Sequence, residues 1–215
     1  MSETDLMVES AAAHLAAFEA APHTPEPQRH VAVVACMDAR LDLFGLLGLK
    51  PGDAHLIRNA GGVATDDVIR SLAISQRKLG TREIVLIHHT NCGMLTFTED
   101  EFRGEMLAET GMRPSWAAEA FTDLDADVRS SIKRIQSDPF IPHRDKVRGF
   151  VYDVNTGVLR EVAPLALQGY FTVSVESRRA TVRRSWGGKQ RHGQARYRDS
   201  PSRESQRCSR GPVQG

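Results

Sequence analysis

The stretch that decides the fold is residues 30–40, whose sequence is HVAVVACMDAR. Residues 30–35 are short in extent and rich in β-branched side chains, and all but His30 are apolar, which is typical of a short, buried β-strand. The strand runs directly into Cys36, Asp38 and Arg40, three residues with chemically active side chains. In open parallel sheets, ligands gather at the carboxyl ends of the strands. The stretch therefore indicates a parallel sheet with a functional site at one edge.

The rest of the chain repeats the alternation of strand and helix. We predict a helix over residues 5–20 capped by Thr4 or Asp5, a strand over 30–35, a helix over 41–47, a strand over 54–58, a helix over 65–79, a strand over 83–87, helical structure over 98–137 and a closing hairpin over 148–162. This order predicts an α/β fold with a mainly parallel central β-sheet flanked by helices.

The charged residues are distributed unequally along the chain: residues 1–164 are acidic overall and residues 165–215 are basic. Residues 1–164 contain 17 Lys and Arg against 24 Asp and Glu, whereas residues 165–215 contain 11 against 3. The last segment is also poor in aliphatic residues, so it cannot bury enough apolar surface to fold. We therefore expect an N-terminal helical arm and Pro-rich linker over 1–28, a globular domain over 29–164 and a basic, disordered tail over 165–215.

Several protein classes are excluded by composition. The longest apolar runs are too short to span a bilayer, so we expect no membrane partner. The first residues, MSETD, lack the basic and apolar regions of a secretory signal, and we expect a cytoplasmic protein. The cysteines are Cys36, Cys92 and Cys208, an odd and sparse set that favours metal binding or catalysis over a disulfide framework.

The third predicted strand also ends in candidate ligands. It runs into His88, His89 and Cys92, and a parallel sheet brings these residues to the same edge as Cys36. Two thiolates and one imidazole leave the fourth position of a tetrahedral zinc open, and the two sulfurs would then lie just under ~4 Å apart. Spacing alone leaves other interpretations open: core cysteines, a redox disulfide, or histidines that bind nothing.

The motifs together resemble one family. Cys36-x-Asp38-x-Arg40 followed by His89-x-x-Cys92 resembles the signature of the β-class carbonic anhydrases. Residues 58–61, RNAG, are similar to a loop of that family, and residues 92–94, CGM, are similar to a turn. The resemblance covers about residues 28–164, so the predicted globular domain corresponds to the catalytic domain, and it is strongest to the short bacterial branch.

The resemblance implies an activity and a cofactor. It implies the reversible hydration of carbon dioxide to bicarbonate and a proton, through a hydroxide on one Zn²⁺ per chain. The implied zinc ligands are Cys36, His89 and Cys92. It also implies a homodimer or a larger homo-oligomer, since members of the family are dimers or multiples of dimers.

Asp38 and Arg40 are the candidate catalytic residues. Asp38 follows the first cysteine closely enough to accept a hydrogen bond from a water at the open zinc position. A bidentate pair with Arg40 would hold that carboxylate ionised and oriented. The alternative is a surface ion pair of little energetic value.

Other functions and roles stay open from the sequence. The same fold could hydrolyse carbon disulfide or carbonyl sulfide, or the protein could be a non-catalytic zinc protein in which Asp38 or Cys208 closes the site. The basic tail has no recognisable nucleic-acid-binding module, so we expect no nucleic-acid partner. Either His88 or His55 could pass the proton to solvent. Asn59 and the glycines at 61–62 are expected to shape the pocket.

Overall fold

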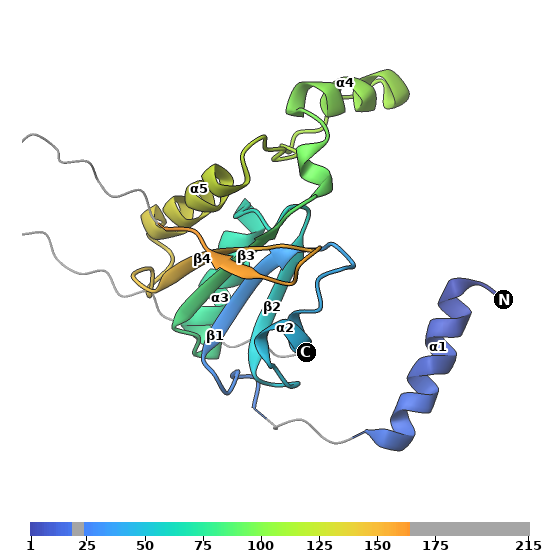
Figure 1. Ribbon diagram of the computed structural model, residues 1–215, viewed down its shortest axis with the longest axis vertical. Coiled ribbons are helices and arrows are strands. Elements are labelled where there is room, and N and C mark those ends of the chain that lie inside the picture. The colour runs from blue at the N-terminus through green and yellow to red at the C-terminus, as the bar shows by residue number, and fades with distance from the viewer. Residues whose placement is uncertain (19–23, 164–215) are drawn as a thin grey trace, which may run out of the picture. The chain divides into compact units, whose positions relative to one another are not determined.

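The computed structural model describes residues 1–18 and 24–163 (Figure 1). The predicted tail over 165–215 lies outside the described residues, as do residues 19–23 of the predicted arm and linker. Helix α1 spans Glu3–His14, and a 3₁₀ turn over Leu15–Ala17 follows it. The predicted cap at Thr4 or Asp5 is wrong: Ser2 caps the helix, and Asp5 completes a capping box by accepting from the Ser2 backbone N–H.

A five-stranded sheet forms the centre of the fold (Figure 1). Its strands are β1 (Val31–Cys36), β2 (Ala54–Asn59), β3 (Glu83–His89), β4 (Val147–Tyr152) and β5 (Leu159–Glu161), and they lie in the order β2-β1-β3-β4-β5. The first four strands are parallel, and β5 returns antiparallel to β4 as the predicted hairpin. The predicted mainly parallel α/β fold is therefore confirmed.

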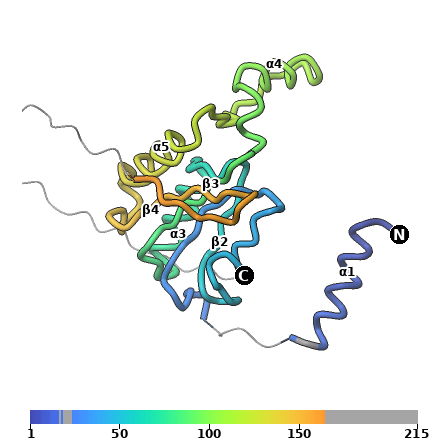
Figure 2. Tube along the Cα trace, viewed as in Figure 1, coloured from blue at the N-terminus to red at the C-terminus, as the bar shows by residue number. Residues whose placement is uncertain are grey.

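Four further helices lie between the strands. They are α2 (Leu43–Leu47), α3 (Asp66–Leu79), α4 (Glu99–Thr110) and α5 (Leu124–Ser137). The prediction of helical structure over 98–137 missed a break, because α4 ends at Gly111 in the left-handed conformation and α5 begins only after its cap, Asp123. Figure 2 follows the chain from β3 through α4 to α5. In the part of the chain described, no helix is long and apolar enough to cross a membrane.

Alternate residues of β1 face two apolar cores. Ala32 and Val34 belong to the core that α3 and α5 cover. Val33 and Ala35 belong to the core on the other face of the sheet, to which α2 contributes. Both cysteines of the predicted ligand set lie in this second core.

The strand register brings the predicted site together. Ala35 of β1 pairs with Arg58 of β2 on one side and with Ile87 of β3 on the other. Because the three strands are parallel, the residues that follow these three positions reach the same edge of the sheet. That edge carries Cys36, Asn59 and the two adjacent histidines of β3.

Candidate metal centre

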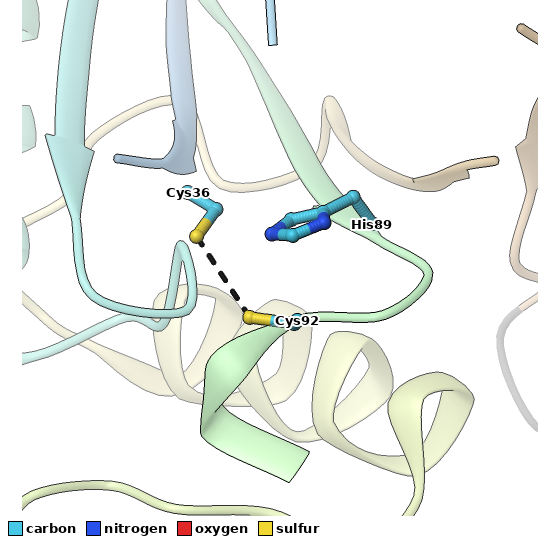
Figure 3. A group of neighbouring side chains, drawn as sticks. All are labelled: Cys36, His89 and Cys92. Carbon is cyan, nitrogen blue, oxygen red and sulfur yellow. Dashed lines mark hydrogen bonds between the residues drawn. The ribbon is translucent and has the colours of Figure 1, made fainter. Parts of the chain in front are cut away.

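Three buried side chains meet at this edge (Figure 3). Cys36 is the last residue of β1, His89 is the last residue of β3, and Cys92 caps the 3₁₀ turn Gly93–Leu95. One potential ligand atom from each residue lies within 4.8 Å of the other two. The two sulfurs are 3.9 Å apart, which matches the separation expected for two thiolates on one tetrahedral zinc.

The orientation of His89 leaves one ring nitrogen free for a metal. Its Nδ1 lies 2.9 Å from the Thr90 carbonyl oxygen, and because a carbonyl can only accept, Nδ1 carries the proton. Nε2 is buried and has no hydrogen-bond partner among the described residues. A hydrogen bond of this kind at the other ring nitrogen is the usual way in which a metal-binding histidine is oriented. The residues therefore fit a zinc ion, since the soft sulfurs and this nitrogen are donors that zinc prefers.

The two sulfurs share a proton in the absence of a metal. The hydrogen bond from Cys92 lowers the pKa of Cys36 to about 4, and the same bond raises the pKa of the Cys92 thiol. The backbone N–H groups of Asp38 and Gly61 also donate to the Cys36 sulfur, and that of Met94 donates to the Cys92 sulfur. These amides stabilise the thiolate forms, which are the forms that bind metals.

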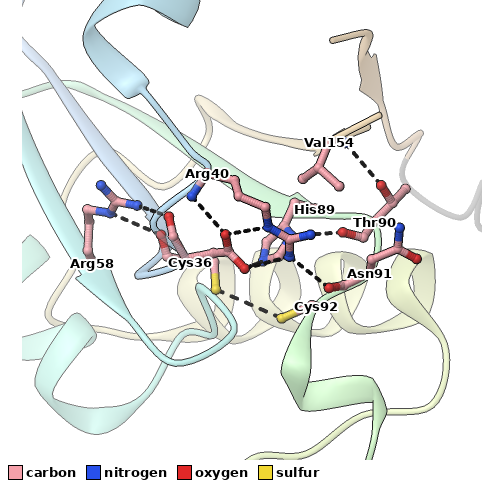
Figure 4. A network of polar contacts seen from close by, with 9 residues as sticks. Cys36, Arg40, Arg58, His89, Thr90, Asn91, Cys92 and Val154 are labelled. Carbon is pink, nitrogen blue, oxygen red and sulfur yellow. Dashed lines mark hydrogen bonds and ion pairs between the residues drawn. The ribbon is translucent and has the colours of Figure 1, made fainter. Parts of the chain in front are cut away.

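Asp38 and Arg40 form the predicted bidentate pair. Figure 4 shows Arg40 among the polar contacts around the cluster. Arg40 Nε donates to Asp38 Oδ1 at 2.8 Å, and Nη2 donates to Oδ2 at 2.7 Å. The Arg40 backbone N–H adds a third bond to Oδ1 at 2.9 Å. These bonds hold the pKa of the Asp38 carboxyl well below its usual range. Oδ2 lies 3.6 Å from His89 Nε2, so the carboxylate stands beside the candidate ligands.

Two further contacts of this edge were missed by the sequence analysis. Arg40 Nη2 also donates to the carbonyl oxygen of Asn91, at 2.9 Å, and so joins the first motif to the loop that carries Cys92. Arg58 donates to the carbonyl oxygens of Cys36 and Asp38. A carbonyl is present at every residue, so no sequence pattern marks these acceptors. The only signal for Arg58 was its place in the RNAG segment.

The structure places neither predicted proton carrier at the cluster. His88 is fully buried, and its Nε2 lies 2.7 Å from Asp127 Oδ2 of α5. His55 lies four residues before Asn59 on β2, about 13 Å along the strand from the site edge. Its Nδ1 is 2.7 Å from Ser75 Oγ of α3.

The loop after β2 packs tightly against the ligand strands. Asn59 Nδ2 donates to the Val63 carbonyl oxygen at 2.9 Å and closes the loop. Gly61 and Gly62 have φ angles of +82° and +75°, which suit glycine. A Cβ on Gly62 would lie 2.8 Å from the backbone nitrogen of Cys36. At Gly62 the loop backbone therefore lies directly against the backbone of β1 and β3, whereas a Cβ on Gly61 would meet the side chains of Val63, Phe121 and Met94.

Comparisons with known proteins agree on one family. The sequence profile described as "Carbonic anhydrase" matches residues 31–159. "Beta-carbonic anhydrase 1" of Mycobacterium tuberculosis (strain ATCC 25618 / H37Rv) is 61% identical over 138 residues, which are 64% of this chain and 85% of the relative. A carbon disulfide hydrolase of Acidianus sp. (strain A1-3) is 33% identical over 159 residues, covering 62% of this chain and 77% of the relative.

A crystal structure gives the same result for the fold. The carbonic anhydrase of Streptococcus mutans superposes with a TM-score of 0.71 at 43% sequence identity. The superposition covers 76% of this chain and 99% of that one.

Proposed function

The chain belongs to the β-class carbonic anhydrases, and from this premise we propose that it catalyses the reversible hydration of carbon dioxide to bicarbonate and a proton. The proposal rests on one observation: the buried cluster of Cys36, His89 and Cys92, whose sulfurs are 3.9 Å apart and whose free Nε2 lies beside the Asp38 carboxylate. We assign one Zn²⁺ per chain to these three residues, and we assign the catalytic roles to Asp38 and Arg40.

When bound, zinc supplies Lewis acidity, which lowers the pKa of a coordinated water to about 7 in the carbonic anhydrases that use three histidines. Two thiolates oppose this effect because their negative charge offsets that of the metal. The backbone N–H groups of Asp38 and Gly61 draw electron density from the Cys36 sulfur, and that of Met94 does so at Cys92. These bonds therefore recover part of the acidity that the thiolates remove.

Asp38 orients the attacking water. Its Oδ1 already accepts from the Nε and backbone N–H of Arg40, whereas Oδ2 accepts one bond, from Nη2. Oδ2 therefore keeps a lone pair for a water proton and faces the cluster at 3.6 Å from His89 Nε2. Arg40 keeps the carboxylate ionised, because its bonds hold the pKa of Asp38 well below the usual range.

The apolar surroundings suit a small linear substrate without charge. The core that contains the two cysteines also contains Val63, Met94 and Phe121. Such side chains exclude bulk water and offer carbon dioxide no competing hydrogen bond.

The oligomeric state and the compartment are part of the proposal. No residue of α1 is buried, although the helix and the turn after it carry Leu6, Met7 and Leu15. This apolar surface supports a homodimer or larger homo-oligomer in which a second copy covers it. Cys36 and Cys92 are free thiols 3.9 Å apart, which suits a reducing cytoplasm.

A stopped-flow hydration assay with a parallel zinc determination tests the function. We expect one zinc per chain, carbon dioxide hydration above the buffer rate, and loss of that activity when zinc is removed by a chelator. Carbon disulfide and carbonyl sulfide belong in the same experiment, because the relative from Acidianus is a carbon disulfide hydrolase. Zinc-loaded protein that hydrolyses carbon disulfide but does not hydrate carbon dioxide would overturn the proposal.

A further inference from the structure

Arg58 of β2 binds the backbone of the first motif (Figure 4). Its Nε donates to the Cys36 carbonyl oxygen at 3.0 Å, and its Nη2 donates to the Asp38 carbonyl oxygen at 2.7 Å. These two carbonyls flank Met37. One guanidinium therefore holds both ends of the segment that joins a candidate zinc ligand to the carboxylate that orients water.

This segment lies just beyond the regular hydrogen bonding of the sheet. The last bond between the β1 and β2 chains runs from the Met37 N–H to the Asn59 carbonyl oxygen, at 2.8 Å. Met37 itself is 65% exposed, so burial does little to fix its conformation. The next backbone bond, from the Leu41 N–H to the Asp38 carbonyl oxygen, is 3.1 Å long. Arg58 thus stabilises the backbone of residues 36–38, where the hydrogen bonds between β1 and β2 end.

We propose that Arg58 is a positioning residue for this reaction, which keeps the Asp38 carboxylate on Arg40 and away from the metal. The proposal rests on the function proposed above. Arg40 holds the side chain of Asp38, and Arg58 holds its backbone. Without Arg58, rotation about Met37 and Asp38 would let the carboxylate move toward His89 Nε2, which is only 3.6 Å from Oδ2.

The geometry requires arginine at this position. Two carbonyls are bound by two adjacent N–H groups of one rigid, planar guanidinium. A lysine ammonium is a single point charge on a flexible stem and does not reproduce this fork. Arg58→Lys should therefore retain only part of the effect, and Arg58→Met should retain none of it.

The test uses the full-length, zinc-loaded protein and three variants. Arg58→Met and Arg58→Lys are compared with Arg82→Met, in which the replaced arginine is exposed just before β3, at the opposite end of the strands from the site. The readouts are zinc content, zinc X-ray absorption, and kcat and KM for carbon dioxide hydration. We expect Arg58→Met to keep its zinc, to gain a carboxylate ligand, and to lose about 10- to 100-fold in kcat. Arg58→Lys should lie between wild type and Arg58→Met, and Arg82→Met should match wild type.

A double-mutant cycle shows whether the effect runs through Asp38. If it does, Arg58→Met should reduce kcat much less in an Asp38→Ala background than in wild type. Unchanged coordination and kcat in both Arg58 variants would overturn the proposal, as would additive losses in the cycle. If wild type does not hydrate carbon dioxide, the proposed function fails separately. The absorption spectra of the Arg58 variants still decide whether Arg58 keeps Asp38 off the metal.

Discussion

Gly62→Ala tests whether the metal centre depends on a backbone contact between the loop after β2 and the two ligand strands. Gly62 has a φ of +75°, and an added Cβ would lie 2.8 Å from Cys36 N, 3.0 Å from Ala35 C and 3.1 Å from Ile87 O. All three are backbone atoms, so no side-chain rotation relieves the overlap. The loop or the end of β1 has to move instead.

The expected loss of stability has two parts. A left-handed conformation costs a residue with a Cβ about 1–2 kcal/mol, and overpacking a tight site adds about 1–3 kcal/mol. Gly48→Ala is the matched control, because Gly48 has a φ of +58° and an added Cβ there would meet no atom of the described residues within 4 Å. Gly48→Ala should lose only the stability that corresponds to the cost of the left-handed conformation, about 1–2 kcal/mol. The difference between the variants, about 1–3 kcal/mol, then measures the close contact.

Urea unfolding of zinc-free protein at one fixed protein concentration measures this difference, since the stability of an oligomer depends on concentration. Zinc stoichiometry is the second readout. Gly62→Ala should bind less zinc because the Cys36 backbone is displaced, whereas Gly48→Ala should bind one zinc per chain. Equal losses of stability in the two variants, with full zinc in both, would refute the argument.

The remaining predictions concern the ligands, the acceptor pair and the tail. Cys36→Ser should lose most of its zinc and activity while Cys208→Ser keeps both; full zinc in Cys36→Ser by atomic absorption would contradict the ligand assignment. Arg40→Ala should keep its zinc but lose about 10- to 100-fold in kcat, because Asp38 is free to bind the metal, and X-ray absorption should detect the added carboxylate. Asp38→Ala should also have a low kcat, but X-ray absorption should show no added carboxylate ligand in it. Near-wild-type turnover in Arg40→Ala would show that the Asp38–Arg40 pair does not keep the carboxylate off the metal. Truncation after residue 166 should leave zinc, kcat and Tm unchanged, since the tail has too little apolar sequence to pack; a clear fall in Tm would disprove this.

The strands and the meeting of the candidate ligands could be predicted because both follow from local patterns. The apolar run predicted over 30–35 is β1 over Val31–Cys36, displaced by one residue. The run predicted over 83–87 continues as β3 to His89, because both histidines are buried and extend the ladder with β4. Once the strands are parallel, the residues after them must share an edge. The family and its fold followed from the same residues.

The break between α4 and α5 was missed although the sequence marks it. Gly111 and Pro114, which are typical of a helix end, stand inside the stretch predicted as helical over residues 98–137. In the structure, Glu99 at the start of α4 accepts hydrogen bonds from the backbone N–H groups of Ala118 and Glu119. The intervening chain is thus held by a contact some twenty residues away in sequence. Local signals therefore mark where α4 ends, whereas the path of the chain that follows depends on this contact, which no local pattern shows.

The difference between local patterns and contacts distant in sequence also explains which parts of the site could be predicted. Residue type made Cys36, Cys92 and the two adjacent histidines candidate ligands, and the resemblance to the carbonic anhydrase family implied the set of Cys36, His89 and Cys92. The supports of that set are mostly backbone groups: the Thr90 carbonyl fixes the tautomer of His89, and the Asn91 carbonyl receives Arg40. A sequence can show which side chains perform the chemistry, whereas the contacts that aim them are set by how the loops at this edge close. Variants at Arg40 and Arg58 perturb those contacts and keep all three ligand side chains, whereas Gly62→Ala displaces the backbone of one ligand, Cys36.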